Sequence, residues 1–163
     1  MLRRIVYGSS TDAGMATVLP LLQTGHRREL TTEPHWSKEE LVRHPEPREL
    51  IRSMRKPGNL DQQGRPVYTL DERRSLTADI YENRVVKQTV ETVQERLNTL
   101  AMDKDSGVSG EAQALARVLE GARRQASFLD EVGFVGRADM PTATLTQDPL
   151  YRRMMAIRAE LAG

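Results

Sequence analysis

The sequence predicts a mainly α-helical fold: an antiparallel helical hairpin with a third packed helix, a short extended segment near residues 66–70 and an irregular N-terminal arm. Two stretches, residues 81–102 and 111–130, place apolar side chains at alternating steps of four and three, as one face of a helix requires. The polar run Asp103–Gly110 between them has the length of a reversing turn. Aromatic residues make up only 4% of the chain, so the core must be largely aliphatic, which suits packed helices.

The central helix, Tyr81–Met102, gives the strongest periodic signal in the chain. Its apolar stripe consists of Val86, Val90, Val93, Leu97 and Leu100. The second helix carries a matching stripe of Leu115, Leu119, Ala122, Ala126 and Leu129. Two such stripes joined by a short turn predict a helical hairpin. A last helix is expected from Pro149, after the N-cap residue Asp148. Its apolar face consists of Leu150, Met154, Ile157 and Leu161.

Residues 36–163 are expected to form this helical domain, and residues 1–35 an arm or accessory segment. The segment Ser37–Arg43 begins with a capping-box pattern, which predicts a short helix. Another helix is expected over Pro47–Lys56, where the proline can occupy the first turn. Glycines and prolines then predict a loop over Pro57–Arg74, around the extended segment.

The N-terminus allows one further interpretation. Leu2–Tyr7 could be a strand that runs into the hydroxyl-rich stretch Gly8–Gly14 and then into a weak helix over Met15–Leu22. This order resembles the opening of flavodoxin-like proteins, in which such a loop wraps a phosphate with backbone N–H groups. A flavodoxin-like fold also needs several later parallel strands, and the sequence after Leu22 does not supply them. A phosphate- or flavin-binding domain therefore stays a third alternative.

Composition limits the possible partners and compartments. Lys and Arg number 24 against 23 Asp and Glu, so the net charge of +1 provides no strong field toward nucleic acid or a membrane. Twenty of the 24 basic residues are Arg, whose guanidinium group pairs bidentately with phosphates and carboxylates. The chain has no Cys and no apolar run near the roughly 20 residues that span a bilayer. We expect a cytoplasmic protein without a membrane partner.

The sequence offers no catalytic constellation. His26, His35 and His44 are too far apart in sequence for ligation from one helix and fall in segments predicted as loops. Adjacent carboxylates such as Glu39 and Glu40 diverge, and no phosphate-binding or nucleophile motif is present. We therefore expect no metal, no cofactor and no enzymatic activity from this chain.

One hexad at the start of the central helix is distinctive. The run Glu82-Asn83-Arg84-Val85-Val86-Lys87 resembles the "ENRFVK" helix of a bacterial family distantly related to McrC-like restriction subunits. In that family a mostly helical region precedes a PD-(D/E)xK nuclease domain. The segment Thr144–Arg152, in which Tyr151 opens the last helix, and the approach Leu41–Arg48 are also similar to the family. The resemblance spans about Leu41 to Arg158 and implies an accessory region of a restriction or DNA-defence nuclease.

Two departures from the family bear on this implication. The chain has Val85 where the family more often has Phe, and Ile80-Tyr81 where it tends to have Thr-Pro. The family's catalytic residues would follow the last helix, whereas this sequence stops at Gly163 and contains no E-x-K triplet. The resemblance thus implies a helical module without its nuclease, and the candidate protein partners are a nuclease domain or a motor subunit. It leaves the oligomeric state open.

The candidate site residues fall into two sets. The motif set is Glu82, Asn83, Arg84, Lys87 and Tyr151. The nucleic-acid set is Arg73, Arg74, Arg84, Lys87, Arg123, Arg124, Arg152 and Arg153. If the fold gathers these cations, we expect weak DNA binding without sequence preference. The alternative role of Asn83 and Arg84 is to hold the Pro57–Arg74 loop by hydrogen bonds. The alternative function of the whole chain is that of a protein-interaction scaffold without a nucleic-acid role.

Overall fold

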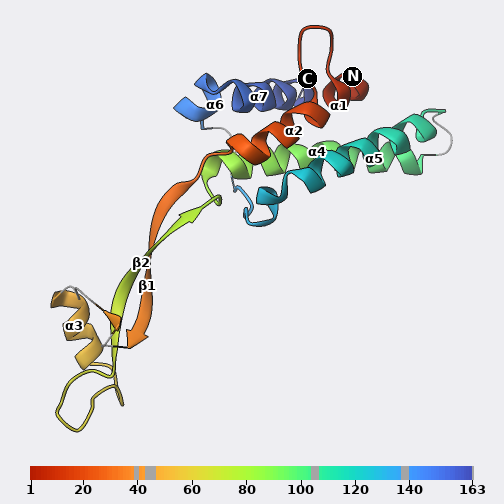
Figure 1. Ribbon diagram of the computed structural model, residues 1–163. Coiled ribbons are helices and arrows are strands. Elements are labelled where there is room, and N and C mark those ends of the chain that lie inside the picture. Colours follow the sequence, from red (N-terminus) through yellow and green to blue (C-terminus); the bar gives the residue numbers. More distant parts are fainter. Residues whose placement is uncertain (39–40, 43–46, 104–106, 137–139, 163) are drawn as a thin grey trace. The chain divides into compact units, whose positions relative to one another are not determined.

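The computed structural model describes residues 1–163 except 39–40, 43–46, 104–106, 137–139 and 163, and it is mainly helical (Figure 1). Its contacts group into two units, Met1–Arg28 with Ala78–Gly163, and Glu29–Thr77. We call the first the helical unit and the second the hairpin unit. The helical unit contains α1 (Leu2–Tyr7), α2 (Met15–Gly25), α4 (Tyr81–Met102), α5 (Ser109–Gln125), η3 (Ser127–Asp130), α6 (Ala143–Gln147) and α7 (Pro149–Ala162). The hairpin unit contains β1 (Glu29–Lys38), α3 (Pro47–Met54) and β2 (Tyr68–Thr77).

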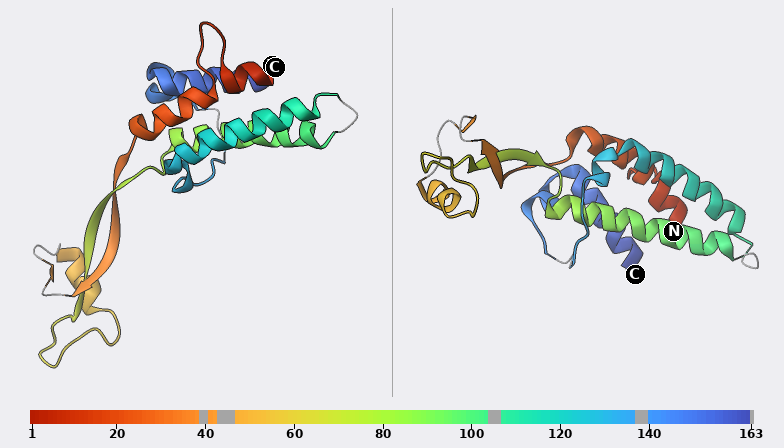
Figure 2. Two further views of the ribbon diagram at one scale, coloured as in Figure 1. Left: turned by 45° about the vertical axis from the view of Figure 1, so that its right-hand side comes forward. Right: turned by 90° about the horizontal axis from the view of Figure 1, so that it is seen from below.

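The predicted helical hairpin is confirmed. Helices α4 and α5 pack side by side, as both views of Figure 2 show. On α4, Val86, Val90, Val93 and Leu97 are buried, and all five residues of the α5 stripe are buried as well. The second helix is interrupted near its predicted end, because Ala126 leaves helical geometry at φ −95° and ψ 57° and the chain continues as η3.

The third packed helix is also confirmed. Helix α7 begins at Pro149 as predicted and contacts both α4 and α2. Met154, Ile157 and Leu161 are buried against this core, and Leu150 is partly buried. Asp148 accepts a hydrogen bond from the Leu150 amide at 3.0 Å, which supports the predicted cap.

The prediction of an irregular N-terminal arm is wrong. Residues 2–7 and 15–25 are helices α1 and α2, and their apolar side chains join the core. The buried members are Ile5, Val6, Met15, Val18, Leu19 and Leu22. Both segments are too short to show a clear period, so burial against α5 and α7, which the sequence does not reveal, decides their structure.

The flavodoxin-like alternative required a strand at Leu2–Tyr7, where the structure has helix α1. The Gly8–Gly14 stretch is a tight turn between two helices. Gly8 has φ +93°, and a Cβ at this position would lie 2.2 Å from the Asp12 carbonyl oxygen. A Cβ at Gly14 would lie 2.3 Å from the Gly8 nitrogen. Close backbone approach therefore accounts for both glycines.

In the hairpin unit, β1 and β2 pair antiparallel over ten residues each, from Glu29 opposite Thr77 to Lys38 opposite Tyr68. The extended segment expected near 66–70 is thus the start of a strand that continues through Asp71–Thr77. The helix expected over Ser37–Arg43 does not begin at Ser37, because Ser37 and Lys38 lie in β1; residues 39–40 and 43 are outside the described residues. The helix expected from Pro47 is confirmed as α3, although it ends at Met54.

The division of the chain into two units differs from the predicted domain boundary between residues 35 and 36. The contacts join residues 1–28 to the central and C-terminal helices, and they separate the segment Glu29–Thr77. Among the described residues, no helix combines the length and apolar character that crossing a bilayer requires.

Candidate functional site

The first two turns of α4 form the centre of a polar network inside the helical unit. Asn83 is completely buried on an otherwise apolar face. Its Nδ2 donates two hydrogen bonds, to the Arg27 carbonyl oxygen at 2.9 Å and to the Ala78 carbonyl oxygen at 2.7 Å. The amide therefore satisfies both of its donors on backbone far apart in sequence, as a buried polar group requires.

Tyr151, in the first turn of α7, completes this network. Its hydroxyl donates to Asn83 Oδ1 at 2.5 Å and accepts a hydrogen bond from the Arg27 amide at 2.8 Å. The side chain is fully buried, and this burial raises the pKa of Tyr151 to about 12. The phenol therefore remains a neutral donor at physiological pH. We call Asn83, Tyr151 and the backbone of Arg27 and Ala78 the polar junction.

The polar junction holds the main chain at the two points where it leaves and re-enters the helical unit. Arg27 is the last residue but one before the hairpin unit, and Ala78 is the first residue after it. One amide side chain thus holds the two points at which the main chain leaves and re-enters the helical unit. A closed set of four hydrogen bonds among buried groups fixes these points more strongly than exposed bonds would.

Arg84, the next residue of the motif, pairs with Asp79. Its Nε and one Nη lie 2.7 Å and 2.8 Å from the two carboxylate oxygens. Asp79 Oδ1 also accepts a hydrogen bond from the Gly133 amide at 2.8 Å. The Arg84 hydrogen bonds, followed by that of Gly133, lower the pKa of Asp79 to about 2. Asp79, held in place by Arg84, thus anchors the loop after η3 through Gly133.

Lys87 holds the same loop one turn further along α4. Its Nζ donates to the Val132 carbonyl oxygen at 2.5 Å and lies 5.1 Å from the centroid of the exposed Phe134 ring. Glu82 is partly exposed, and its charge contributes to the raised pKa of Tyr151. The motif residues therefore organise three segments of the helical unit. The Pro57–Arg74 loop, which we expected them to hold, receives none of the hydrogen bonds of Asn83 or Arg84 described here.

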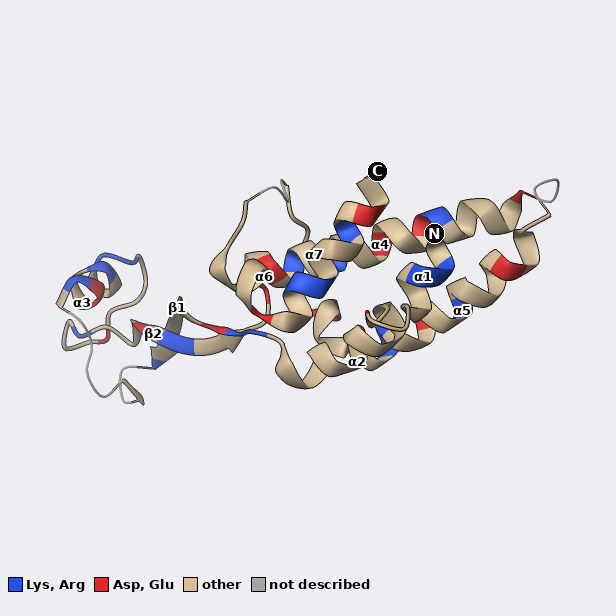
Figure 3. Ribbon diagram, turned by 90° about the horizontal axis from the view of Figure 1, so that it is seen from above, with Lys and Arg blue, Asp and Glu red and all other residues tan. Residues whose placement is uncertain are grey.

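The basic residues predicted to face nucleic acid are mostly engaged within the chain. Arg123 pairs with Asp130 at 2.7 Å, and Arg124 pairs with Glu120 at 2.5 Å. Both lie near the end of α5, whereas Arg152 and Arg153 lie on α7; α5 and α7 each contact α2. In Figure 3, basic and acidic bands are interspersed over the helical unit.

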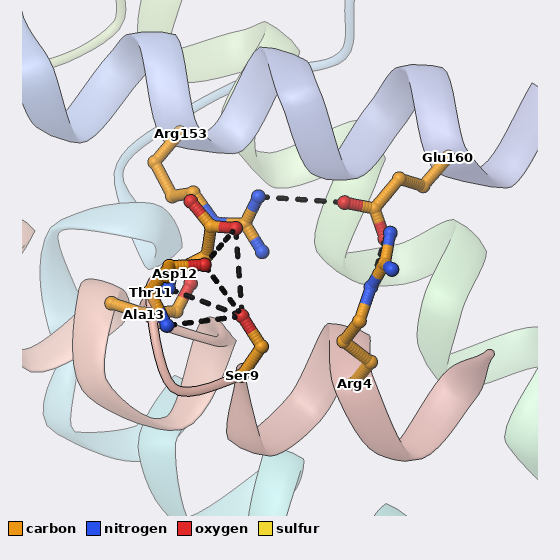
Figure 4. A network of polar contacts seen from close by, with 7 residues as sticks. All are labelled: Arg4, Ser9, Thr11, Asp12, Ala13, Arg153 and Glu160. Carbon is orange, nitrogen blue, oxygen red and sulfur yellow. Dashed lines mark hydrogen bonds and ion pairs between the residues drawn. The ribbon is translucent and has the colours of Figure 1, made fainter.

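Arg153 belongs to a network that closes the α1–α2 turn (Figure 4). Its Nε donates to the Ala13 carbonyl oxygen at 2.6 Å, and Nη1 lies 3.4 Å from Glu160. Glu160 also pairs with Arg4 at 3.0 Å. Arg152 is exposed and makes no ion pair among the described residues. The contacts of Arg153 and Glu160 therefore give the α1–α2 turn a structural role.

Arg73 and Arg74 are in β2, opposite Glu33 and Thr32. As successive residues of a strand they point to opposite faces of the sheet, so one flat surface cannot use both. Both are exposed and make no ion pair within the described part of the hairpin unit.

Histidines and carboxylates show no metal-binding geometry in the part of the chain that the structure describes: no three of them are suitably grouped. His26 stacks on Phe128, with ring centroids 4.3 Å apart, and its Nδ1 lies 3.0 Å from the Gln23 carbonyl oxygen. His35 is exposed in β1, and His44 is outside the described residues.

Sequence reasoning missed the partners of the motif. The Arg27 and Ala78 carbonyl oxygens could not be found by residue type, because every residue carries such a group. Asp79 was detectable in principle, as an acidic residue five positions before Arg84. Asp148 was recognised as a cap, but its 3.8 Å ion pair with Arg27 was not.

Comparisons with known proteins add no identification. No family model, curated protein or solved structure matches this chain.

Proposed function

We propose that this chain is a non-catalytic docking module of a restriction or DNA-defence nuclease system, and that its hairpin unit contacts the nuclease domain. One observation carries the proposal: among the described residues of the hairpin unit, no large hydrophobic side chain is buried. Many are exposed instead. They are Leu30, Trp36, Leu41, Ile51, Met54, Leu60, Val67, Tyr68 and Leu76.

The strand register gathers part of this apolar surface on one face. Leu30 lies opposite Leu76, and Trp36 lies opposite Leu70. All four have even numbers, and side chains two residues apart on a strand share a face. Leu30 and Leu76 are 61% and 63% exposed. Large apolar side chains exposed together on one face of a sheet favour a protein partner.

Charge supports a protein partner over nucleic acid. The hairpin unit contains nine Lys and Arg residues and nine Asp and Glu residues. A balanced surface has no net attraction for phosphate, which dominates affinity in nucleic-acid binding. Of the eight basic candidates for DNA contact, Arg84, Lys87, Arg123, Arg124 and Arg153 make hydrogen bonds or ion pairs within the chain.

The resemblance around Glu82–Lys87 supplies the choice of a nuclease domain as the partner, and with it a cytoplasmic location. A scaffold that serves an unrelated assembly is the alternative. It shares the docking surface and differs in the partner, so a binding measurement separates the two.

The test is to titrate the chain with a purified PD-(D/E)xK nuclease domain of the family that it resembles, and to measure binding by isothermal titration calorimetry. The double variant Leu30→Thr/Leu76→Thr removes the apolar pair and keeps residues that favour strands. We expect its affinity to fall by about tenfold or more, as for the loss of central apolar contacts.

The matched control is Thr31→Ala/Ser75→Ala, the neighbouring cross-strand pair on the opposite face. Its affinity should stay within about twofold of the unmodified chain, because it lies outside the apolar face. Equal losses in both variants, or no binding to the nuclease by the unmodified chain, would contradict the proposal.

A further inference from the structure

The first turn of α7 holds the chain at Arg27 through two side chains. The Tyr151 hydroxyl accepts the hydrogen bond from the Arg27 amide at 2.8 Å. Asp148, just before α7, lies 3.8 Å from the Arg27 guanidinium. Leu150 also lies close to the main chain before Arg27, since a Cβ on Gly25 would be 3.6 Å from a methyl group of Leu150. Placement of α7 and placement of the chain at residues 25–27 are therefore linked.

Ala78 has no such direct link to α7 through the polar junction. Its carbonyl oxygen is bound by Asn83 Nδ2 at 2.7 Å, and Asn83 in turn accepts the bond from Tyr151 at Oδ1. The amide plane is rigid, so the orientation that serves Tyr151 with the oxygen also sets where the two N–H groups point. Rotation of this amide would place its oxygen against two carbonyl oxygens, and neither of those carbonyl oxygens would then receive a hydrogen bond from Asn83.

From this geometry we infer that the first turn of α7 is a latch for the two points at which the chain leaves and re-enters the helical unit: Tyr151 fixes the Asn83 amide, and Asn83 fixes the main chain at Arg27 and Ala78. A partner that displaces the first turn of α7 would release Arg27 directly and Ala78 through Asn83. By linkage, a partner that immobilises these two points would stabilise the seating of α7. This coupling holds whichever partner the hairpin unit binds.

Hydrogen exchange of the full-length chain, read by mass spectrometry, tests the latch. Tyr151→Phe keeps the buried ring and removes both hydrogen bonds of the hydroxyl. We expect exchange to become about tenfold faster or more in residues 26–31, the size expected for the loss of a buried hydrogen bond. We expect a similar acceleration in residues 75–80. Within this segment, residues 78–80 report on the Asn83 relay, because they lie outside the register with β1 and strand pairing does not link them to residues 29–31. Exchange over residues 112–122 of α5 should change little.

Asn83→Asp tests the second step separately. A carboxylate can still accept the Tyr151 hydrogen bond, but it cannot donate to the Arg27 and Ala78 carbonyl oxygens. Both reporter segments should again exchange faster. If Asn83→Asp fails to fold, Asp148→Asn replaces it. This variant removes the carboxylate that lies near the Arg27 guanidinium and places no charge in the core. It should accelerate hydrogen exchange in residues 26–31 more than in residues 75–80.

Two control variants make the same chemical changes at exposed positions. Tyr7→Phe lies in α1 and Asn98→Asp lies in α4, and neither residue is buried. Neither variant should accelerate exchange in the two reporter segments. The latch is overturned if Tyr151→Phe accelerates residues 26–31 alone, or if it accelerates α5 as much as the two reporter segments, which would indicate general destabilisation.

Discussion

Asn83 shows how one polar residue on an apolar stripe can carry structural information. Its neighbours on the helix, Val86 and Val90, are buried by the hydrophobic effect and accept many packing arrangements. An amide buried among them is stable only when its oxygen and both N–H groups have partners. The chain therefore tolerates few positions for Arg27, Ala78 and Tyr151, and this restriction supplies a specificity that aliphatic packing alone does not.

Asp79 gives a prediction on pH dependence. Its pKa is about 2 in the folded protein, below the ordinary value of 3.8, because of its hydrogen bonds from Arg84 and Gly133. The ionised carboxylate therefore stabilises the fold above about pH 4, and this contribution disappears as the pH falls through about 2. The full shift corresponds to roughly 2 kcal/mol, and we expect about 1 kcal/mol, because the side chain is 32% exposed and screened by solvent.

Urea unfolding of the unmodified chain and of Asp79→Asn between pH 2 and pH 6 measures this contribution. The difference in unfolding free energy should be largest above pH 4 and shrink toward pH 2. Asp130→Asn is the control, since Asp130 pairs with Arg123 at an exposed site. A constant difference across the range would show that the carboxylate's charge is not what stabilises the loop.

At the scale of the elements, Leu97 tests the α4–α5 hairpin. It is completely buried, so Leu97→Ala should destabilise the protein by about 2 to 5 kcal/mol through lost burial and a residual cavity. Leu21→Ala makes the same change on α2 at a side chain that is 50% exposed, and should cost less than about 1 kcal/mol. Denaturant melts of both variants provide the measurement, and similar losses would place Leu97 outside the core.

The helical stripes were predictable because each is long enough to repeat its period several times. Helix α1 was not, because its short apolar run fits a strand or a helix equally well and contacts with α2 and α5 decide between them. Helix α2 was only weakly indicated, over Met15–Leu22. Strand β2 was missed beyond Leu70 for another reason. Most of its described residues there are exposed or only partly buried, so alternation of polar and apolar residues is weak.

The polar junction was half predictable. The resemblance singled out Asn83 and Tyr151, and their distance in sequence gave no reason to expect the hydrogen bond that the structure shows between them. The two backbone carbonyl oxygens that complete the network have no sequence signature. The prediction that Arg84 and Lys87 contact nucleic acid stays a prediction, although both groups already have partners in the chain.

At the scale of the whole molecule, the pairing of its arginines decides how it should behave toward DNA. Each phosphate that a protein neutralises on duplex DNA contributes about −0.9 to the log–log slope of affinity against salt. Among the eight candidates, the side chains of Arg73, Arg74 and Arg152 make neither an ion pair nor a hydrogen bond among the described residues. Arg73 and Arg74 point to opposite sides of the sheet, and Arg152 belongs to the helical unit. We therefore expect at most about one phosphate contact from each unit and a slope no steeper than about −2.

Fluorescence anisotropy with a labelled duplex, from low ionic strength to about 0.2 M salt, measures this slope. The double variant Arg123→Ala/Arg124→Ala should leave it unchanged, because these guanidinium groups are held by Asp130 and Glu120. Arg152→Ala should flatten it by about one unit with little change in melting temperature, since an exposed arginine adds little stability. A slope near −4 that the Arg123/Arg124 variant flattens by about two units would instead mean that both ion pairs open to meet phosphate. DNA contact, and not protein docking, would then be the better account of this module.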